Sequence, residues 1–439
     1  MKRNMKNLVV GLALLVLCMG TLSAAGKKDA PVTETTNNSA AEAKKVVLTW
    51  PVWGTTDLQY YTEINNLKEA YQAYAPNVTI EIEQFKSTDD FENAMKIRFA
   101  ADEFPDVLGL KPYMLAKWAD MLMDLSGQPA VTSSLFPDSG KVGTKVVAVP
   151  RHVLNEYVYY SKSLFAKAGV KVPQTWSELI DVSKKLKAAG ITPIIIGAKD
   201  VWPTYPFTEY MAALETNNGE YWNLMATQDE PFKAGTGINK AYFKFQDLVK
   251  AGAFDVNSAI GLGFDQAKLL FAAKKGAMFA AGMWFLPDFK ENIGGDMNDL
   301  GIFYLPVRDR LSDNLIATAQ IDGFMAVPLK AKNPQESIKF INWMLTSDYY
   351  KGFINFYKAL PTVKGVALDE KFFDNAPKNV LGGPLTFTTY DGGNVEYQRI
   401  ANAVQFDCKR TGQEIIVGSD LNQIFASLNS KWKTAKAQK

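Results

Sequence analysis

The stretch that decides the fold is Lys145–Lys187, KVVAVPRHVLNEYVYYSKSLFAKAGVKVPQTWSELIDVSKKLK. Its pattern predicts a strand, an irregular segment led by Pro150, a second strand, a short helix and then a longer helix. The spacing of Thr175 and Glu178 predicts a capping box at the start of the longer helix. Gly190 ends that helix, because glycine favours the left-handed backbone of a helix terminus. Strands and helices thus alternate through this stretch, which is typical of α/β proteins.

The chain before this stretch alternates in the same way. Val46–Trp50 and Val78–Glu83 predict two strands, and a helix with apolar residues from Ile64 to Tyr74 separates them and ends before Pro76. This order predicts βαβ units and a largely parallel sheet. A chain of 439 residues is long enough for two such folded units.

Composition and charge indicate a globular protein with a nearly neutral surface. Hydrophobic residues make up 47% and charged residues 21% of the chain, and the formal net charge is +2. This charge falls by three when Lys2, Arg3 and Lys6 are removed with a leader. Non-specific nucleic-acid binding needs a basic surface, so we expect no nucleic-acid partner.

The N-terminus has the features of a secretory signal over residues 1–25. The three basic residues precede an apolar run, Leu8–Leu17, which is much shorter than the roughly 20 residues that span a bilayer. Cleavage before Gly26 would release a soluble extracytoplasmic protein, in the periplasm or its equivalent. Alternatively, Cys18 carries a lipid, and the polar residues 26–45 form a flexible linker. Both interpretations stay open.

The few cysteine and histidine residues argue against internal disulfide bonds and metal sites. With Cys18 removed or lipidated, Cys408 has no partner, so we expect no internal disulfide. His152 is the only histidine, and no ligand cluster for zinc accompanies it. It has no nucleophile signature such as G-x-S-x-G near it either. We therefore predict no metal, no cofactor and no catalytic residue.

Four segments of the chain carry a family pattern. In order, they are Tyr157–Gly169 (YVYYSKSLFAKAG), Pro173–Leu179 (PQTWSEL), Gly276–Trp284 (GAMFAAGMW) and Gln320–Val327 (QIDGFMAV), the last followed by Lys332, Asn333 and Pro334. Taken together, they resemble bacterial extracellular solute-binding proteins of the family that serves carbohydrate ABC transporters (family 1, maltose-binding-protein-like). The resemblance runs from Val46 to about Trp432. The chain departs from the family pattern at Ser161 and Ser163, where Asn and Asp are customary, and has one glycine, Gly323, where two are common.

The resemblance implies an α/β fold of two lobes, the type II periplasmic-binding-protein fold, in which each lobe is a mostly parallel sheet flanked by helices. Two-lobed binding proteins cross between lobes more than once, and we place crossings near Val149–Asn155 and between Leu305 and Gln320. Lobe 1 is then 46–150 with 316–361, and lobe 2 is 151–315 with 362–439. The lobes would close on a ligand and dock on membrane permease subunits of an ABC importer, and we expect a monomer. The chain has no G-x-x-x-x-G-K-S/T loop, so it is not the ATP-hydrolysing subunit.

The candidate ligand-binding residues follow strands, because ligands in such folds lie at the carboxyl ends of strands. Aromatic rings suit the apolar faces of a mono- or oligosaccharide, and carboxylates, amides and guanidinium groups suit its hydroxyls. The family places a ligand-contacting tryptophan at Trp284, which makes it the strongest candidate. Each candidate has a structural alternative, such as a helix cap for Asp57 or a core role for His152. The candidates are Trp53, Asp57, Lys111, Tyr113, Arg151, His152, Asn155, Trp202, Tyr205, Trp284, Gln320, Asp322 and Asp391.

Three other functions compete with sugar capture. A secreted glycoside hydrolase would need two carboxylates roughly 5–10 Å apart, and no motif proposes such a pair. A binding protein for a polyamine would use the same aromatic and acidic residues. The third is a surface lipoprotein that binds no small ligand, and no solute would stabilise such a protein.

Overall fold

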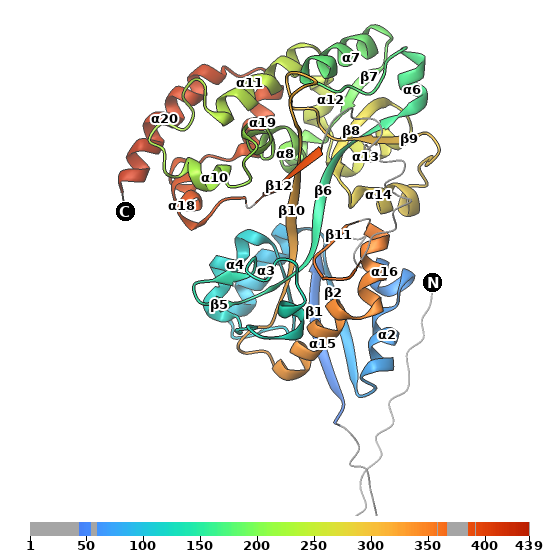
Figure 1. Ribbon diagram of the computed structural model, residues 1–439, viewed down its shortest axis with the longest axis vertical. Helices are drawn as coiled ribbons and strands as arrows, with labels where there is room; N and C mark the ends of the chain where they lie inside the picture. The colour runs from blue at the N-terminus through green and yellow to red at the C-terminus, as the bar shows by residue number, and fades with distance from the viewer. Residues whose placement is uncertain (1–43, 54–58, 358, 367–384, 391, 439) are drawn as a thin grey trace, which may run out of the picture. The chain divides into compact units, whose positions relative to one another are not determined.

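Two long strands organise the structure, β6 (Val149–Ser161) and β10 (Leu315–Ala326), which lie side by side (Figure 1). The computed structural model describes residues 44–53, 59–357, 359–366, 385–390 and 392–438. β6 and β10 pair antiparallel, from Asn155 opposite Ala319 to Val149 opposite Met325. Beyond Asn155 they separate: β6 continues beside β8 (Gly276–Gly282) and β9 (Leu300–Phe303), while β10 pairs with β12 (Leu385–Tyr390). The two strands therefore form a fork.

The predicted irregular segment at Pro150 is wrong, because Pro150 lies inside the continuous strand β6. Proline has no N–H for the ladder, and the pairing beside it is irregular on both strands: Asp322 in β10 and Arg151 in β6 each have no residue opposite them. The pairing shifts register on both sides of Gly323 in β10, opposite Pro150 and His152. A bulge of this kind bends the strand and changes the direction of the side chains around it.

A first group of elements packs around β1 (Val46–Trp53) and β2 (Val78–Phe85), which pair in parallel. The predicted helix from Ile64 to Tyr74 is interrupted. A π-helical turn, η1 (Tyr60–Ile64), comes first, and α2 (Leu67–Tyr74) begins only after Asn66, whose side chain accepts from the N–H of Glu69. The group also contains α3 (Thr88–Ala100), β3 (Leu108–Leu110), α4 (Pro112–Trp118), α15 (Pro334–Thr346) and α16 (Asp348–Tyr357).

A second group of elements surrounds β7 (Thr192–Ile195) and β8. Its helix α7 (Trp176–Ala188) confirms the predicted start and end: the Thr175 hydroxyl accepts from the N–H of Glu178, and Gly190 has φ of 72°. The Glu178 carboxylate reaches the N–H of Gln174 (2.7 Å), one residue before the predicted position. The group's other elements are α6 (Lys162–Lys167), η3 (Ala198–Asp200), η4 (Trp202–Thr204), α8 (Tyr205–Thr208), α9 (Met211–Thr216), α10 (Tyr221–Met225), α11 (Gly237–Lys250), α12 (Val256–Gly261), α13 (Phe264–Ala272), α14 (Phe285–Pro287), η5 (Asp288–Asn292), α18 (Val395–Val404), α19 (Cys408–Ile416) and α20 (Leu421–Ala437).

One mixed sheet of eight strands joins the two groups within the described residues. Its main order is β12-β10-β6-β8-β7, with β9 and β11 (Leu360–Pro361) on β6 and β3 on β10. The sequence predicted a largely parallel sheet, and the β1–β2, β7–β8 and β10–β12 pairs are parallel. Every pair made by β6 is antiparallel, so the sheet as a whole is mixed. Short elements complete the chain: η2 (Ala119–Met121), α5 (Pro129–Thr132), β4 (Lys141–Val142) and β5 (Lys145–Val146).

Apolar burial within each group holds these elements in place. Trp50 and Tyr61 contact each other in the first group, and Trp222, Phe232 and Trp432 are buried together in the second. In the part of the chain that the structure describes, no helix has the length and apolar character needed to cross a membrane.

Candidate functional site

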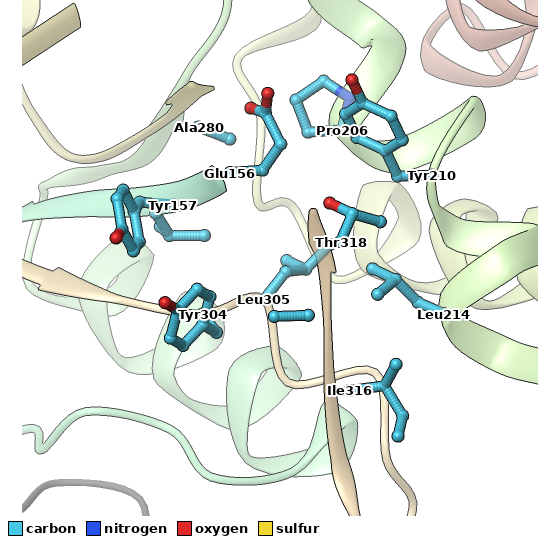
Figure 2. A pocket seen from close by; sticks show the side chains of 12 residues that line it. Glu156, Tyr157, Pro206, Tyr210, Leu214, Ala280, Tyr304, Leu305, Ile316 and Thr318 are labelled. Atoms are coloured by element: carbon cyan, nitrogen blue, oxygen red, sulfur yellow. The ribbon is translucent and has the colours of Figure 1, made fainter. Parts of the chain in front are cut away.

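The fork between β6 and β10 contains a small hollow (Figure 2). It begins where the pairing of the two strands ends, at the pair of Asn155 and Ala319. Its lining residues from the two strands follow Asn155 in β6 and precede Ala319 in β10. Side chains alternate across a strand, and Figure 2 shows the Glu156 carboxylate and the Tyr157 ring on opposite sides of β6. The hollow is lined by Glu156, Tyr157, Val158, Pro206, Tyr210, Leu214, Ala280, Tyr304, Leu305, Ile316, Ala317 and Thr318.

Glu156 is the acidic group of this hollow. Its Oε2 accepts a hydrogen bond from the Tyr205 hydroxyl (2.5 Å), and that hydroxyl accepts from the N–H of Gly282 (2.9 Å). Burial raises the pKa of Glu156 well above its ordinary value, against the lowering effect of the Tyr205 hydrogen bond. The negative charges of Asp322 and Glu209 raise this pKa further, and Lys111 lowers it.

Four aromatic side chains form a cluster beside Glu156, which we call the aromatic cluster: Trp202, Tyr205, Phe264 and Trp284. The Trp202 ring lies 4.5 Å from that of Phe264 and 5.9 Å from that of Trp284, between centroids. Trp202 and Tyr205 are stacked at 6.0 Å. Trp202 remains 37% exposed, and Trp284 is half-buried, so ring surface is open to a ligand. The cluster brings together three of the residues predicted from the sequence.

Gly282, at the end of β8, leaves room for the atoms that face this cluster. A Cβ at this position would lie 2.3 Å from Nε1 of Trp284 and 2.9 Å from Oε1 of Glu156. The Trp284 indole and the Glu156 carboxyl therefore pack directly against Gly282, and only a glycine allows this close approach. This gives a physical reason for the small residue that precedes Trp284 in the sequence.

Two predicted residues of β10 lie next to this arrangement. The Tyr210 hydroxyl donates to Oε1 of Gln320, and Asp322, two residues further along the strand, forms an ion pair with Lys111 at the N-terminus of α4. The Lys111 ammonium also lies 5.7 Å from the centroid of the Trp53 ring, which packs on Phe91. Lys111, Asp322 and Trp53 thus form a second polar and aromatic group, contributed by the first group of elements and β10.

Arg151 and His152 lie in a different environment from the fork. Both are 7% exposed, and the Arg151 guanidinium lies 4.9 Å from the Phe353 ring and donates to the Tyr61 hydroxyl (2.7 Å). Burial, together with the positive charge of Arg151, lowers the pKa of His152 well below its ordinary value. These contacts with α16 and η1 suit a packing role at the start of β6, and a ligand role for either residue stays a prediction.

The remaining predicted residues are scattered. Tyr113 is 45% exposed and donates to Glu92 (3.1 Å). Asn155 is fully buried; the hydroxyls of Tyr157 and Tyr304 lie beside it, but its amide atoms make no hydrogen bond of good geometry within the described residues. Asp57 and Asp391 lie outside the described residues.

Sequence reasoning missed two residues of the fork, Glu156 and Tyr210. A signal for Glu156 existed, since it is the one charged residue in Val153–Tyr160, a run that is apolar or aromatic apart from Asn155. A carboxylate is rare in a largely buried strand unless it has a role or a partner. Tyr210 follows a short helix and had no comparable signal. Among the described residues, no group of three or more histidine, cysteine or acidic side chains is arranged to hold a metal ion.

Replacing Gly282 by alanine is expected to weaken ligand binding at least tenfold, a change of about 1.4 kcal/mol. The new methyl group would displace the Trp284 indole and the Glu156 carboxyl from their positions against Gly282. Titration calorimetry measures the effect. Gly261→Ala, which meets nothing within 4 Å, is the matched control. Equal affinity in both variants would show that ligand binding does not depend on these positions of Trp284 and Glu156.

Replacing Glu156 by glutamine is expected to raise the unfolding free energy relative to wild type, by an amount that grows with pH. A carboxyl with a raised pKa in the folded state contributes stability below its ordinary value of 4.5 and loses it as the pH rises through the folded-state value. Glutamine does not titrate. The difference in unfolding free energy between variant and wild type, from urea denaturation at several pH values, should therefore grow with pH. A difference that stays constant with pH would contradict the raised pKa.

Comparison with known proteins identifies the family of the chain and several relatives. A family model described as bacterial extracellular solute-binding protein matches residues 55–351. The multiple sugar-binding protein of Streptococcus mutans serotype c is 24% identical over 310 residues, which cover 69% of this chain and 72% of that protein. The sn-glycerol-3-phosphate-binding periplasmic protein of Brucella abortus is 28% identical over 240 residues, covering 52% of this chain and 48% of that protein.

The fold is also similar to solved structures. A binding protein of an ABC transporter from Bifidobacterium animalis subsp. lactis, in complex with mannobiose, superposes with a TM-score of 0.73. Its sequence is 17% identical, and the match covers 90% of this chain and 95% of that one. This likeness confirms the two-lobed α/β fold predicted from the sequence.

Proposed function

Because the chain belongs to the family of bacterial extracellular solute-binding proteins, we propose that it captures a sugar or oligosaccharide outside the cytoplasm and delivers it to the permease of an ABC importer. The observation that carries this proposal is the aromatic cluster beside the polar groups of Glu156, Tyr210 and Gln320. Aromatic faces bind the apolar faces of sugar rings, and paired polar groups bind hydroxyls. The multiple sugar-binding relative supports the same ligand class.

The charges around the site favour a neutral ligand. Asp322 is already neutralised by Lys111, and the raised pKa of Glu156 favours its uncharged form. A polyamine would need free carboxylates, so this arrangement argues against one. A phosphate ester would need free cations, and Lys111, the cation that acts on Glu156, is engaged with Asp322. A carbohydrate requires neither.

The proposed mechanism is closure of two lobes on the ligand. We assign residues 46–150 and 316–361 to one lobe and 151–315 and 362–439 to the other. Only a ligand that binds the closed state more tightly can shift the equilibrium toward it. Contacts with Trp284 and Glu156 from one lobe and with the Lys111–Asp322 pair near the other would supply that difference. Residues 1–25 are proposed as the export signal, with lipidation at Cys18 as the alternative.

A glycoside hydrolase would require a free carboxylate pair about 5–10 Å apart across the substrate. Glu156 is hydrogen-bonded to Tyr205, and Asp322 is ion-paired with Lys111. This arrangement favours binding without bond cleavage.

A thermal-shift screen tests the proposed function. The mature protein is heated with mono- and oligosaccharides, with spermidine as a polyamine and with sn-glycerol-3-phosphate. A bound ligand at a hundredfold excess over its dissociation constant stabilises the folded state by about 2.7 kcal/mol. We expect a shift with a carbohydrate and no change in that carbohydrate on chromatography. A shift with the amine or the phosphate ester alone would overturn the ligand assignment, and turnover would overturn the binding function.

A further inference from the structure

Val201 has a backbone conformation that its side chain disfavours. Its φ of 64° and ψ of −61° are close to those of the classic γ-turn, which is rare and strained. Of the five non-glycine residues with positive φ in the described part of the chain, Val201 is the one with a β-branched side chain. A branched Cβ makes this conformation especially unfavourable. The surrounding structure must therefore hold Val201 in place.

The packing of the Val201 side chain does not explain this conformation. The side chain is half-buried and belongs to none of the apolar cores that the described residues form. Val201 instead connects η3 to η4, and Trp202, the first residue of η4, follows it directly. Resting on the function proposed above, we propose that the strained turn at Val201 positions the Trp202 ring for the carbohydrate. Val201 is then a positioning residue of the binding site.

The segment before the turn is fixed to the start of α13. Oδ2 of Asp200 accepts from the backbone N–H of Phe264 (2.7 Å). The ring of the same Phe264 lies 4.5 Å from the Trp202 ring, between centroids. The two neighbours of Val201 in the chain thus contact one residue. The chain must reverse sharply between them, and a γ-turn does this within three residues.

The segment after the turn is fixed to α19. The N–H of Thr204 donates to the carbonyl of Val201 (3.2 Å), and the buried Thr204 hydroxyl donates to the carbonyl of Lys409 (2.7 Å). α19 approaches closely here, since a Cβ on Gly412 would lie 2.6 Å from Cβ of Thr204. Contacts on both sides of the turn therefore hold Trp202 in the aromatic cluster with 37% of its surface exposed.

The strain makes the position of Trp202 depend on these contacts. When one of them is lost, Val201 can relax to an ordinary negative φ, and Trp202 then leaves its place beside Phe264. The apparent affinity for a ligand falls with the fraction of molecules in the binding-competent conformation. Val201→Gly removes this dependence, because glycine adopts positive φ about as readily as negative φ. The turn would then survive the loss of a contact.

The test removes one contact and asks whether glycine restores the site. Asp200→Ala deletes the acceptor for the Phe264 N–H, and we expect it to bind the carbohydrate found in the screen about tenfold more weakly than wild type. The double variant Asp200→Ala/Val201→Gly should bind within about threefold of wild type. The matched control is Asp200→Ala/Gln405→Gly, which should not restore affinity. Gln405 also has a positive φ, of 57°, but lies at the exposed end of α18. Titration calorimetry measures each affinity.

Fluorine NMR of the free protein, labelled with fluorotryptophan, makes the test independent of the ligand. The Trp202 resonance is the one that Trp202→Phe removes. We expect Asp200→Ala to shift or broaden it and the added Val201→Gly to restore it. An unchanged affinity or an unchanged resonance in Asp200→Ala would overturn the proposal, as would an equal loss of affinity with and without Val201→Gly. If the resonance responds as expected but no carbohydrate binds wild type, the proposed function fails while the positioning of Trp202 by the turn stands.

Discussion

Trp284→Ala is expected to weaken carbohydrate binding by about 100-fold or more, a loss of about 2.7 kcal/mol, while the protein stays folded. The indole supplies ring surface to the aromatic cluster, and it packs closely against Gly282. Because Trp284 is half-buried, its removal leaves no large cavity in the core. Titration calorimetry measures the affinity, and circular dichroism checks the fold.

The matched control for this prediction is Trp343→Ala on α15. Trp343 is also half-buried and packs on aromatic rings, those of Tyr71 (4.9 Å) and Tyr349 (5.2 Å), within the first group of elements. It should lower the melting temperature without changing affinity. If Trp284→Ala binds as tightly as wild type, Trp284 is not part of the ligand site.

Asp106→Ala is expected to lower the unfolding free energy by about 3 kcal/mol. Asp106 is 2% exposed, and its carboxylate accepts from the backbone N–H groups of Thr49 (3.0 Å) and Asn333 (2.9 Å). It also accepts from the Thr49 hydroxyl (3.1 Å) and the Asn333 amide (3.2 Å). The carboxylate therefore joins β1 to the start of α15, and alanine would leave these donors without a partner.

Urea denaturation measures this loss. Asp106→Asn, which keeps one carbonyl acceptor, is the control and should cost less than the alanine variant. A loss below about 1 kcal/mol for Asp106→Ala would show that water replaces the carboxylate at no large cost.

The sequence predicted those parts of the fold that depend on local pattern. The start of α7 at Thr175 and its end at Gly190 follow from side-chain capping and from the backbone freedom of glycine, and both are confirmed. The two-lobed fold was predicted from a resemblance and is confirmed as well. In contrast, the continuity of β6 through Pro150 depends on a register shift at Gly323 in β10, far away in the sequence. Local pattern carries no information about such a compensation.

The candidate site shows the same division. Trp202, Tyr205 and Trp284 were chosen as aromatic residues that follow strands, and the fold brings them together. Glu156 was missed because its role depends on where β6 leaves β10, which is a property of the sheet. Arg151 and His152 follow Pro150, as the resemblance required, yet their contacts with Tyr61 and Phe353 arise from α16 and η1. Sequence order alone could not distinguish these two environments.

The most direct measurement is a crystal structure of the protein with the carbohydrate that the screen identifies. The account predicts a sugar ring against Trp202 and Trp284, with a sugar hydroxyl within hydrogen-bond distance of the Glu156 carboxyl. A carbohydrate bound away from the fork of β6 and β10, or one that leaves the rings of Trp202 and Trp284 uncovered, would contradict it.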